Sequence, residues 1–234
     1  QPVLEPLGIR LRVNRWWGLA WLLPVAVLLI GIALVWAEGF EPVLTVEQLV
    51  ANKRSAVPPD QVAQFDAYLA KNTPPHPLML IVMGMPAGLT FNLIPGMCEE
   101  VAFRGYYFRE ISGGFWARST KIGILWWLWL SPSVALGNLY GSPGLAGVAL
   151  LLPWCILASL VLVYIRVRSE SVVATAIARG TMIALTAAAH DLTFGTPTWL
   201  APFYGIAGIA ALGLIWLTCW ADDRRRTSGK LTTS

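Results

Sequence analysis

Two adjacent acidic residues, Glu99 and Glu100, follow an apolar run in the segment GMCEEVAFRGYYFREI. Placing a charge at the bilayer centre costs about 2.5–3.5 kcal/mol on insertion scales, so ionisable residues in apolar segments are the first candidates for function. Neighbouring helical residues point about 100° apart, and the two carboxylates should therefore face different partners. A carboxylate held in an apolar site can act as a general base toward water.

Two arginines are positioned to pair with these carboxylates. Arg104 follows Glu100 by four residues, the spacing at which side chains share one face of a helix. Arg179 is the one basic residue inside a later apolar segment. A guanidinium near both carboxylates would hold them in a bidentate ion pair. We therefore predict a structural ion pair of Arg179 with Glu99 and Glu100.

The histidines and cysteines offer little metal chemistry. The chain has two histidines and three cysteines without paired spacing, so no metal site and no cofactor are predicted. His190 is a candidate ligand for a metal or a tetrapyrrole, although a hydrated side chain is the alternative. Trp126, Trp127 and Trp129 cover more than one face of their helix, so some of them must contact the bilayer, a partner, or a bound lipid or pigment.

The composition predicts an integral membrane protein that positions these residues on helices. Of 234 residues, 56% are hydrophobic and 13% are charged, and the mean hydropathy is +0.60, which leaves too little polar surface for a soluble protein. The apolar residues form blocks of about 20 rather than alternating stretches of about 10, which favours helices over a barrel. The net charge of +4 reflects basic residues that flank the spans, so no nucleic-acid partner is expected.

We predict an all-α, polytopic membrane helix bundle of about six transmembrane helices, formed by residues 1–234 as a single domain. The expected spans are residues 16–37, 78–97, 115–136, 144–165, 171–189 and 199–220. Most lysines and arginines then lie on one side, which places both termini in the cytoplasm and predicts a multi-pass protein of the bacterial cytoplasmic (inner) membrane.

Two polar segments complete the predicted topology. Residues 38–77 form one long outer loop, in which Thr45 and Asp60 precede short amphipathic runs typical of N-capped helices. Residues 222–234 form a basic tail that we expect to be disordered. The lipid bilayer is therefore the first predicted partner of the chain.

The sequence EEVAFRG at residues 99–105 resembles the first motif of the CAAX protease and bacteriocin-processing family. This group, also called the abortive-infection family, contains the Rce1-like glutamate-type intramembrane proteases. Its motif is a glutamate pair followed after three residues by an arginine, which Glu99, Glu100 and Arg104 match. The resemblance covers residues 79–189. It implies that a glutamate activates the attacking water, with histidines and an asparagine stabilising the oxyanion.

The other motifs of this family are altered here. Trp126 occupies the aromatic position of the second motif, but Leu130 stands at its histidine. In the third motif Arg179 replaces the histidine and Ile183 the asparagine. A register with Asn138 as the substitute donor fits the surrounding residues less well. Loss of one oxyanion-hole donor typically slows a reaction by about 10²–10³.

These replacements lead to two hypotheses of different classes. In the first, the chain is a degenerate, catalytically weak or inactive member of the family, a pseudoenzyme that acts as a binding or accessory subunit with membrane-protein partners. In the second, it is an active glutamate-dependent intramembrane endopeptidase. Glu99 and Glu100 would then process a prenylated or membrane-associated protein.

Overall fold

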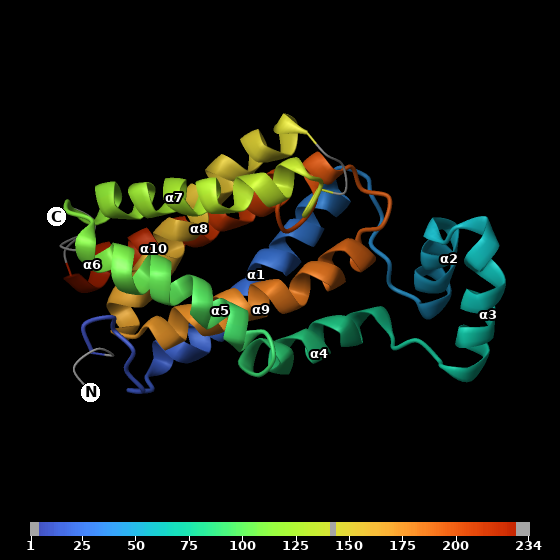
Figure 1. Cartoon of the computed structure of the whole chain (residues 1–234), viewed down its shortest axis with the longest axis horizontal. Helices are drawn as coiled ribbons and strands as arrows, with labels where there is room; N and C mark the ends of the chain where they lie inside the picture. The colour runs from blue at the N-terminus through green and yellow to red at the C-terminus, as the bar shows by residue number, and fades with distance from the viewer. Residues whose placement is uncertain (1–4, 141–143, 228–234) are drawn as a thin grey trace.

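The computed structural model describes residues 5–140 and 144–227, and this part of the chain is built from helices and their connections (Figure 1). The predicted all-α class is therefore confirmed. The main helices are α1 (Arg15–Ala37), α2 (Val46–Ala56), α3 (Val62–Lys71), α4 (Pro77–Leu89), α5 (Leu93–Glu100), α7 (Phe115–Ala135), α8 (Leu145–Ser169), α9 (Val172–Leu192) and α10 (Ile206–Thr227).

The predicted count of six membrane spans is not confirmed within the described residues. Within the described residues, α1, α8, α9 and α10 are long and apolar enough to cross a bilayer, and a bent pair starting with α4 would make a fifth span. Helix α7 has 21 residues but is not among these candidates. Its first half carries Arg118 and Lys121, and its second half is rich in tryptophan, which lowers its hydropathy. The count of six is therefore not confirmed.

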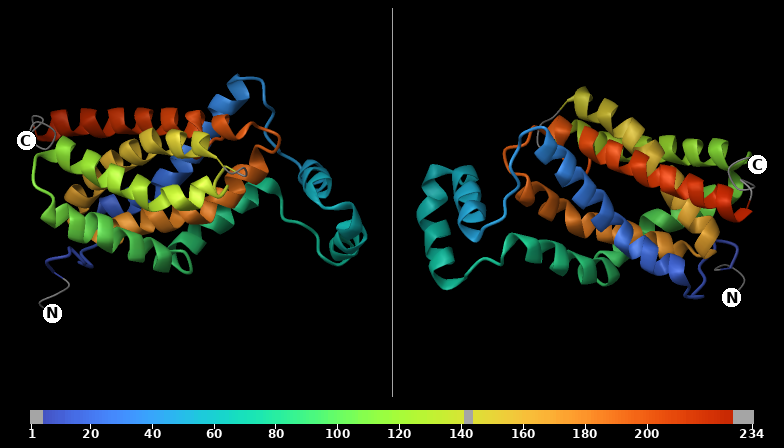
Figure 2. Two further views of the ribbon diagram at one scale, coloured as in Figure 1. Left: turned by 45° about the horizontal axis from the view of Figure 1, so that its top comes forward. Right: turned by 180° about the vertical axis from the view of Figure 1, so that it is seen from behind.

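Helix α9 forms the centre of the bundle. It packs against α1, α4, α5 and α8 (Figure 2). Its start is defined by Ser171, whose hydroxyl accepts a hydrogen bond from the Val173 amide at 3.1 Å. Glu170, in the left-handed conformation at φ 56°, ends α8 and reverses the chain into α9. Side chains of α9 can therefore meet several neighbouring helices in the interior.

The predicted span 78–97 is not one helix. It breaks at residues 90–92, where Thr90 leaves the helical conformation (φ −120°, ψ −101°), and the two parts meet at 56°. After α5 the chain continues as a π-helix, η2 (Val101–Tyr107), and a short turn, α6 (Phe108–Glu110). The break allows α5 to lie along α9 although α4 approaches from another direction (Figure 1).

The predicted outer loop contains a helical hairpin of α2 and α3, which projects beyond one end of the bundle (Figure 2). Thr45 caps α2 in a capping box with Gln48, as its sequence predicts. Asp60 does not cap α3. It lies within a short 3-10 helix, η1 (Pro59–Gln61), and the residue at the cap is Gln61, which forms no capping hydrogen bond.

The last helix starts later and ends later than predicted. A short 3-10 helix, η3 (Thr198–Leu200), precedes α10, which extends to Thr227 rather than giving way to a disordered tail at residue 222. Asp223 pairs with Arg168 of α8 at 3.3 Å, and Asp222 accepts a hydrogen bond from Tyr164, so this part of the tail packs on the bundle. Residues 228–234 of the predicted tail lie outside the described residues.

The α2–α3 hairpin and the ends of α1 and α10 that are rich in basic residues lie at opposite ends of the bundle (Figure 1). The start of α1 and the end of α10 lie together at the end opposite to the α2–α3 hairpin (Figure 1). This arrangement places the basic residues near α1 and α10 far from the outer hairpin. The cytoplasmic location of that end stays a prediction.

Candidate functional site

The site lies where α5 crosses α9, and two glycines allow the helices to approach closely. A Cβ atom on Gly180 would lie 2.7 Å from the carbonyl oxygens of both Gly88 and Asn92. A Cβ atom on Gly96 would lie 2.6 Å from the carbonyl oxygen of Ala176. Larger residues would therefore clash with backbone rather than with movable side chains. This contact brings the end of α5, with both glutamates, against α9.

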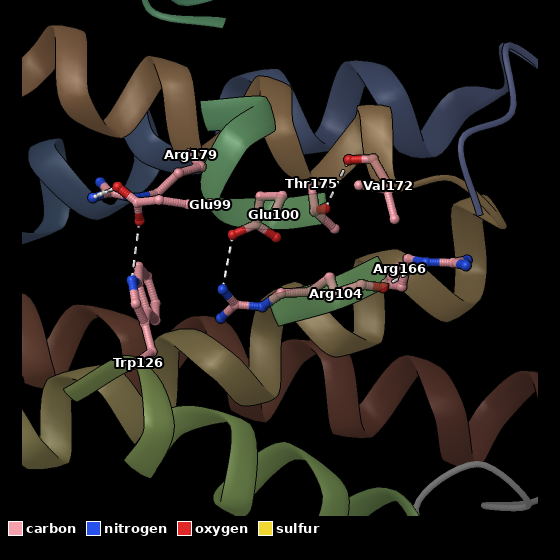
Figure 3. A network of polar contacts seen from close by, with 8 residues as sticks. All are labelled: Glu99, Glu100, Arg104, Trp126, Arg166, Val172, Thr175 and Arg179. Atoms are coloured by element: carbon pink, nitrogen blue, oxygen red, sulfur yellow. Dashed lines mark hydrogen bonds and ion pairs between the residues drawn. The ribbon is translucent and has the colours of Figure 1, made fainter. Parts of the chain in front are cut away.

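Glu99 is held by Arg179 through both of its oxygens (Figure 3). The Arg179 Nε donates to Oε2 at 2.8 Å, and Nη2 donates to Oε1 at 2.9 Å. This fork-to-fork geometry is the strongest form of a carboxylate ion pair. The exposed fractions of the two side chains are 19% for Glu99 and 8% for Arg179, so water screens the pair weakly.

Glu100 points to a different neighbour and is fully buried. Its Oε1 accepts a hydrogen bond from Arg104 Nη1 at 2.8 Å, and neither side chain is exposed. Thr175 of α9 lies on the other side of Glu100 (Figure 3), and its hydroxyl donates to the Val172 carbonyl at 2.8 Å. The structure thus brings Arg179 to Glu99, while Glu100 is paired with Arg104 instead.

Trp126 of α7 connects the two ion pairs. Its Nε1 donates to Oε2 of Glu99 at 3.1 Å, and the side chain is fully buried. The guanidinium carbons of Arg104 and Arg179 lie 4.4 and 5.3 Å from the centre of its ring, within cation–π range. Both arginines have buried nitrogens without a hydrogen-bond partner among the described residues. The indole face therefore compensates part of their lost hydration.

The π-helix η2 carries Arg104, whose backbone carbonyl contacts α8. A π-helix of this kind is rare and is often found at functional sites. The Arg104 carbonyl oxygen accepts a hydrogen bond from Nε of Arg166 in α8 at 3.1 Å (Figure 3). Arg166 also stacks over Phe108 with 5.4 Å between its guanidinium carbon and the ring centre. Helix α8 therefore anchors the end of the segment that carries the glutamates.

A pocket of about 640 Å³ reaches Glu99 from between α5, η2 and α7. Apart from the carboxylate, its walls are mainly apolar and aromatic, and they comprise Cys98, Ala102, Phe103, Tyr107, Leu125, Leu128 and Trp129. Glu100 and Arg104 do not line this pocket. Glu99 is thus the one member of the two ion pairs that a bound apolar molecule could contact there.

The other candidate residues lie apart from this cluster or bring no polar group to it. Leu130 and Ile183 are half-buried hydrocarbon side chains. Asn138 donates to Ser133 at 2.6 Å in the turn after α7 and forms no hydrogen bond with Glu99 or Glu100 in the described chain. The side chain of His190 is 75% exposed at the outer end of α9, and its Nδ1 lies 3.8 Å from Asp191.

Several features of the site were not predicted. The hydrogen bond from Trp126 to Glu99, the π-helix and the contact of Arg166 with the Arg104 carbonyl have no local sequence pattern. The one available signal was Trp126 at the aromatic position of the second motif. Its role as a hydrogen-bond donor depends on how α7 packs against α5, which the sequence does not encode locally.

The fold and the site together define a helical integral membrane protein with two Glu–Arg pairs in the interior of its bundle. Comparison with family models matches residues 81–185 to the type II CAAX prenyl endopeptidase Rce1-like family. These residues, which run from α4 to α9 and include both ion pairs and Trp126, are thus an Rce1-like segment, and the resemblance predicted from the sequence is confirmed over this range. No curated protein and no solved structure matches the chain.

Proposed function

We propose that this chain is a catalytically inactive Rce1-like protein that serves as a binding or accessory subunit of a membrane complex. The observation that carries the proposal is the environment of Glu99, whose two oxygens accept hydrogen bonds from Arg179 and whose Oε2 also accepts one from Trp126. A general base must instead accept a proton from an attacking water within about 2.6–3.2 Å. The bidentate pair stabilises the anion and opposes that transfer.

The positions of the histidines, and the residue types at the altered motif positions, support the same conclusion. The sequence has only two histidines, and His190 lies eleven residues after Arg179 on the same helix, which corresponds to about 16 Å. His76 caps the start of α4, where its Nδ1 accepts from the Leu78 amide. Neither imidazole is placed to orient a water at Glu99. The hydrocarbon side chains of Leu130 and Ile183 cannot donate to an oxyanion.

The second candidate function is the active endopeptidase, and the pocket beside Glu99 is the observation that favours it. Its volume of about 640 Å³ and its apolar walls would accept a hydrophobic segment, and the exposed 19% of Glu99 faces this space. An active enzyme would require Arg179 to swing away from the carboxylate. A negatively charged partner for Arg179 would then have to come from the substrate.

The surfaces that would contact a partner are exposed apolar side chains on α7 and the outer hairpin. Of the three clustered tryptophans, Trp126 lies in the site and Trp127 donates to the Val148 carbonyl at 2.7 Å. Only Trp129 is strongly exposed, at 67%, next to the half-exposed Leu128. We propose a second integral membrane protein of the bacterial cytoplasmic membrane as the partner of this face.

The catalytic half of the proposal is tested by proteolysis in lipid nanodiscs. The intact chain is incubated with prenylated and non-prenylated membrane peptides, and products are measured by mass spectrometry. Variants Glu99→Ala and Glu100→Ala serve as references. We expect the same background for all three proteins. Cleavage by the intact chain that is lost in either variant would establish the endopeptidase.

The binding half is tested by purifying the tagged full-length chain from its native membrane in mild detergent. We expect a stoichiometric membrane-protein partner that is lost on Trp129→Ala. Leu214→Ala is the matched control, because Leu214 is 50% exposed on α10 and lies away from α7 in sequence. An unaltered yield with Trp129→Ala, or no stoichiometric partner at all, would contradict the proposed subunit role.

A further inference from the structure

A second cavity, separate from Glu99, lies between α1, α8 and α10. It has a volume of about 400 Å³. Its apolar walls are formed by Leu19, Leu22, Leu23, Ala26, Val161, Ile165, Ile215 and Cys219. Leu19 and Leu22 are each about half exposed, at 49% and 50%, so this groove is open along its side. Two of its three walls, α1 and α10, lie outside the Rce1-like segment of residues 81–185.

Tyr164 and Asp222 line one end of the groove, and Thr218 is a further polar residue in its α10 wall. The start of α1 and the end of α10 meet at this end of the bundle (Figure 1). The Tyr164 hydroxyl donates to Asp222 Oδ2 at 2.9 Å, and Arg168 Nη2 lies 3.6 Å from the same oxygen. The guanidinium carbons of Arg168 and Arg15 lie 5.9 and 5.5 Å from the ring centre of Trp16. The mouth of the groove therefore combines positive and negative charge around an aromatic ring.

The length of the groove matches one leaflet of a bilayer. From Trp16 at its mouth to Ala26 at its deepest point on α1 is ten residues, or about 15 Å along the helix. This is half of the roughly 30 Å hydrocarbon core. The length and the apolar walls of the groove therefore suit one hydrocarbon chain of a single leaflet.

We propose that this groove binds one acyl chain of a phospholipid whose headgroup carries a primary amine. Arg15, which forms no ion pair within residues 5–140 and 144–227, faces the lipid phosphate. Asp222, with 27% of its side chain exposed, accepts a hydrogen bond from the ammonium. A primary ammonium has three N–H donors for the carboxylate, whereas a quaternary ammonium has none. This site is independent of the proposed function, because it shares no residue with the Glu99 pocket.

The proposal is tested by native mass spectrometry of the full chain. The detergent-purified protein is exchanged into equimolar phosphatidylethanolamine, phosphatidylcholine and phosphatidylglycerol with identical acyl chains. We expect one tightly retained lipid, with phosphatidylethanolamine enriched about tenfold over phosphatidylcholine, the ratio that 1.4 kcal/mol provides. Equal retention of the three lipids, enrichment of phosphatidylglycerol, or no retained lipid would overturn the proposal.

Two variants separate the headgroup from the acyl chain. Asp222→Asn should retain a lipid but lose the enrichment over phosphatidylcholine. Ala26→Trp fills the groove and should abolish retention of every lipid, and Leu22→Trp does the same from the rim if Ala26→Trp does not fold. The matched control is Leu217→Trp, at a residue of α10 that is 55% exposed and outside the groove. Retention by a folded groove-filling variant, or loss by the control, would contradict the assignment.

Discussion

Arg179 of α9 clamps Glu99 of α5 through two parallel hydrogen bonds of 2.8 and 2.9 Å. The two residues are 80 positions apart in sequence, and their contact depends on the close crossing of α5 and α9. In the family resemblance, Arg179 stands where a histidine would position the attacking water. Under the proposed function, the bidentate pair with Arg179 would keep Glu99 as an anion instead of letting it accept a proton from water.

Removing one member of the Glu99–Arg179 pair should destabilise the protein strongly. Arg179→Leu leaves the largely buried carboxylate of Glu99, which is 19% exposed, without its ion-pair partner. Removing one partner of a buried pair typically costs about 3–5 kcal/mol. The double variant Glu99→Leu/Arg179→Leu should recover much of this loss, because no isolated charge is left. Equilibrium unfolding in lipid–detergent micelles measures both.

The matched control for this cycle is the exposed pair of Arg54 and Asp66, which are in contact at 2.7 Å in the outer hairpin. Arg54→Leu should change stability by less than about 1 kcal/mol, as is usual for surface pairs. Equal losses of unfolding free energy in Arg54→Leu and Arg179→Leu would show that the Arg179–Glu99 pair stabilises the protein no more than an exposed ion pair does.

The indole nitrogen of Trp126 should matter more than that of its neighbour. Trp126→Phe removes a hydrogen bond to the charged Glu99 and should cost about 1.5–3 kcal/mol. Trp127→Phe removes a hydrogen bond to the neutral Val148 carbonyl and should cost only about 0.5–1.5 kcal/mol. Comparison of the two unfolding free energies checks the claim, and a larger loss at Trp127 would contradict it.

The glycine contact should determine whether the pair can form. Gly180→Ala introduces a Cβ atom 2.7 Å from the carbonyl oxygens of Gly88 and Asn92 and should destabilise the protein by about 1–3 kcal/mol, as the junction of α4 and α5 moves away from α9. Gly213→Ala on α10 is the control, because no atom lies within 4 Å of the Cβ position there. Thermal unfolding of both variants gives the comparison. A tolerated Gly180→Ala would mean that the helices can separate without loss.

The sequence predicts the helical class, and it places α1, α7 and most of α9 close to their observed limits. Helix α1 is an apolar run with basic residues before it, and Ser171 marks the start of α9. The break at residues 90–92 was missed because it lies inside an apolar run. There Gly180 of α9 admits the carbonyl oxygens of Gly88 and Asn92. Such a bend depends on tertiary contact and leaves no local pattern.

In the candidate site, too, local spacing predicts some contacts, whereas others depend on tertiary packing. The four-residue spacing of Glu100 and Arg104 points to a shared helix face, and these side chains are in contact in the structure. The sequence predicted an ion pair of Arg179 with both Glu99 and Glu100. The structure joins it to Glu99. The choice follows from the packing of α5 on α9, and the hydrogen bond of Trp126 follows from the packing of α7.

The most direct measurement of the central claim is the rate of peptide hydrolysis by the intact chain relative to Glu99→Ala, in the same nanodiscs and in water enriched in oxygen-18. Hydrolysis places the heavy oxygen in the new carboxylate, so turnover is separated from contaminating fragments. We predict equal rates of label incorporation for the two proteins. Label incorporation that requires Glu99 would contradict the assignment of an inactive site.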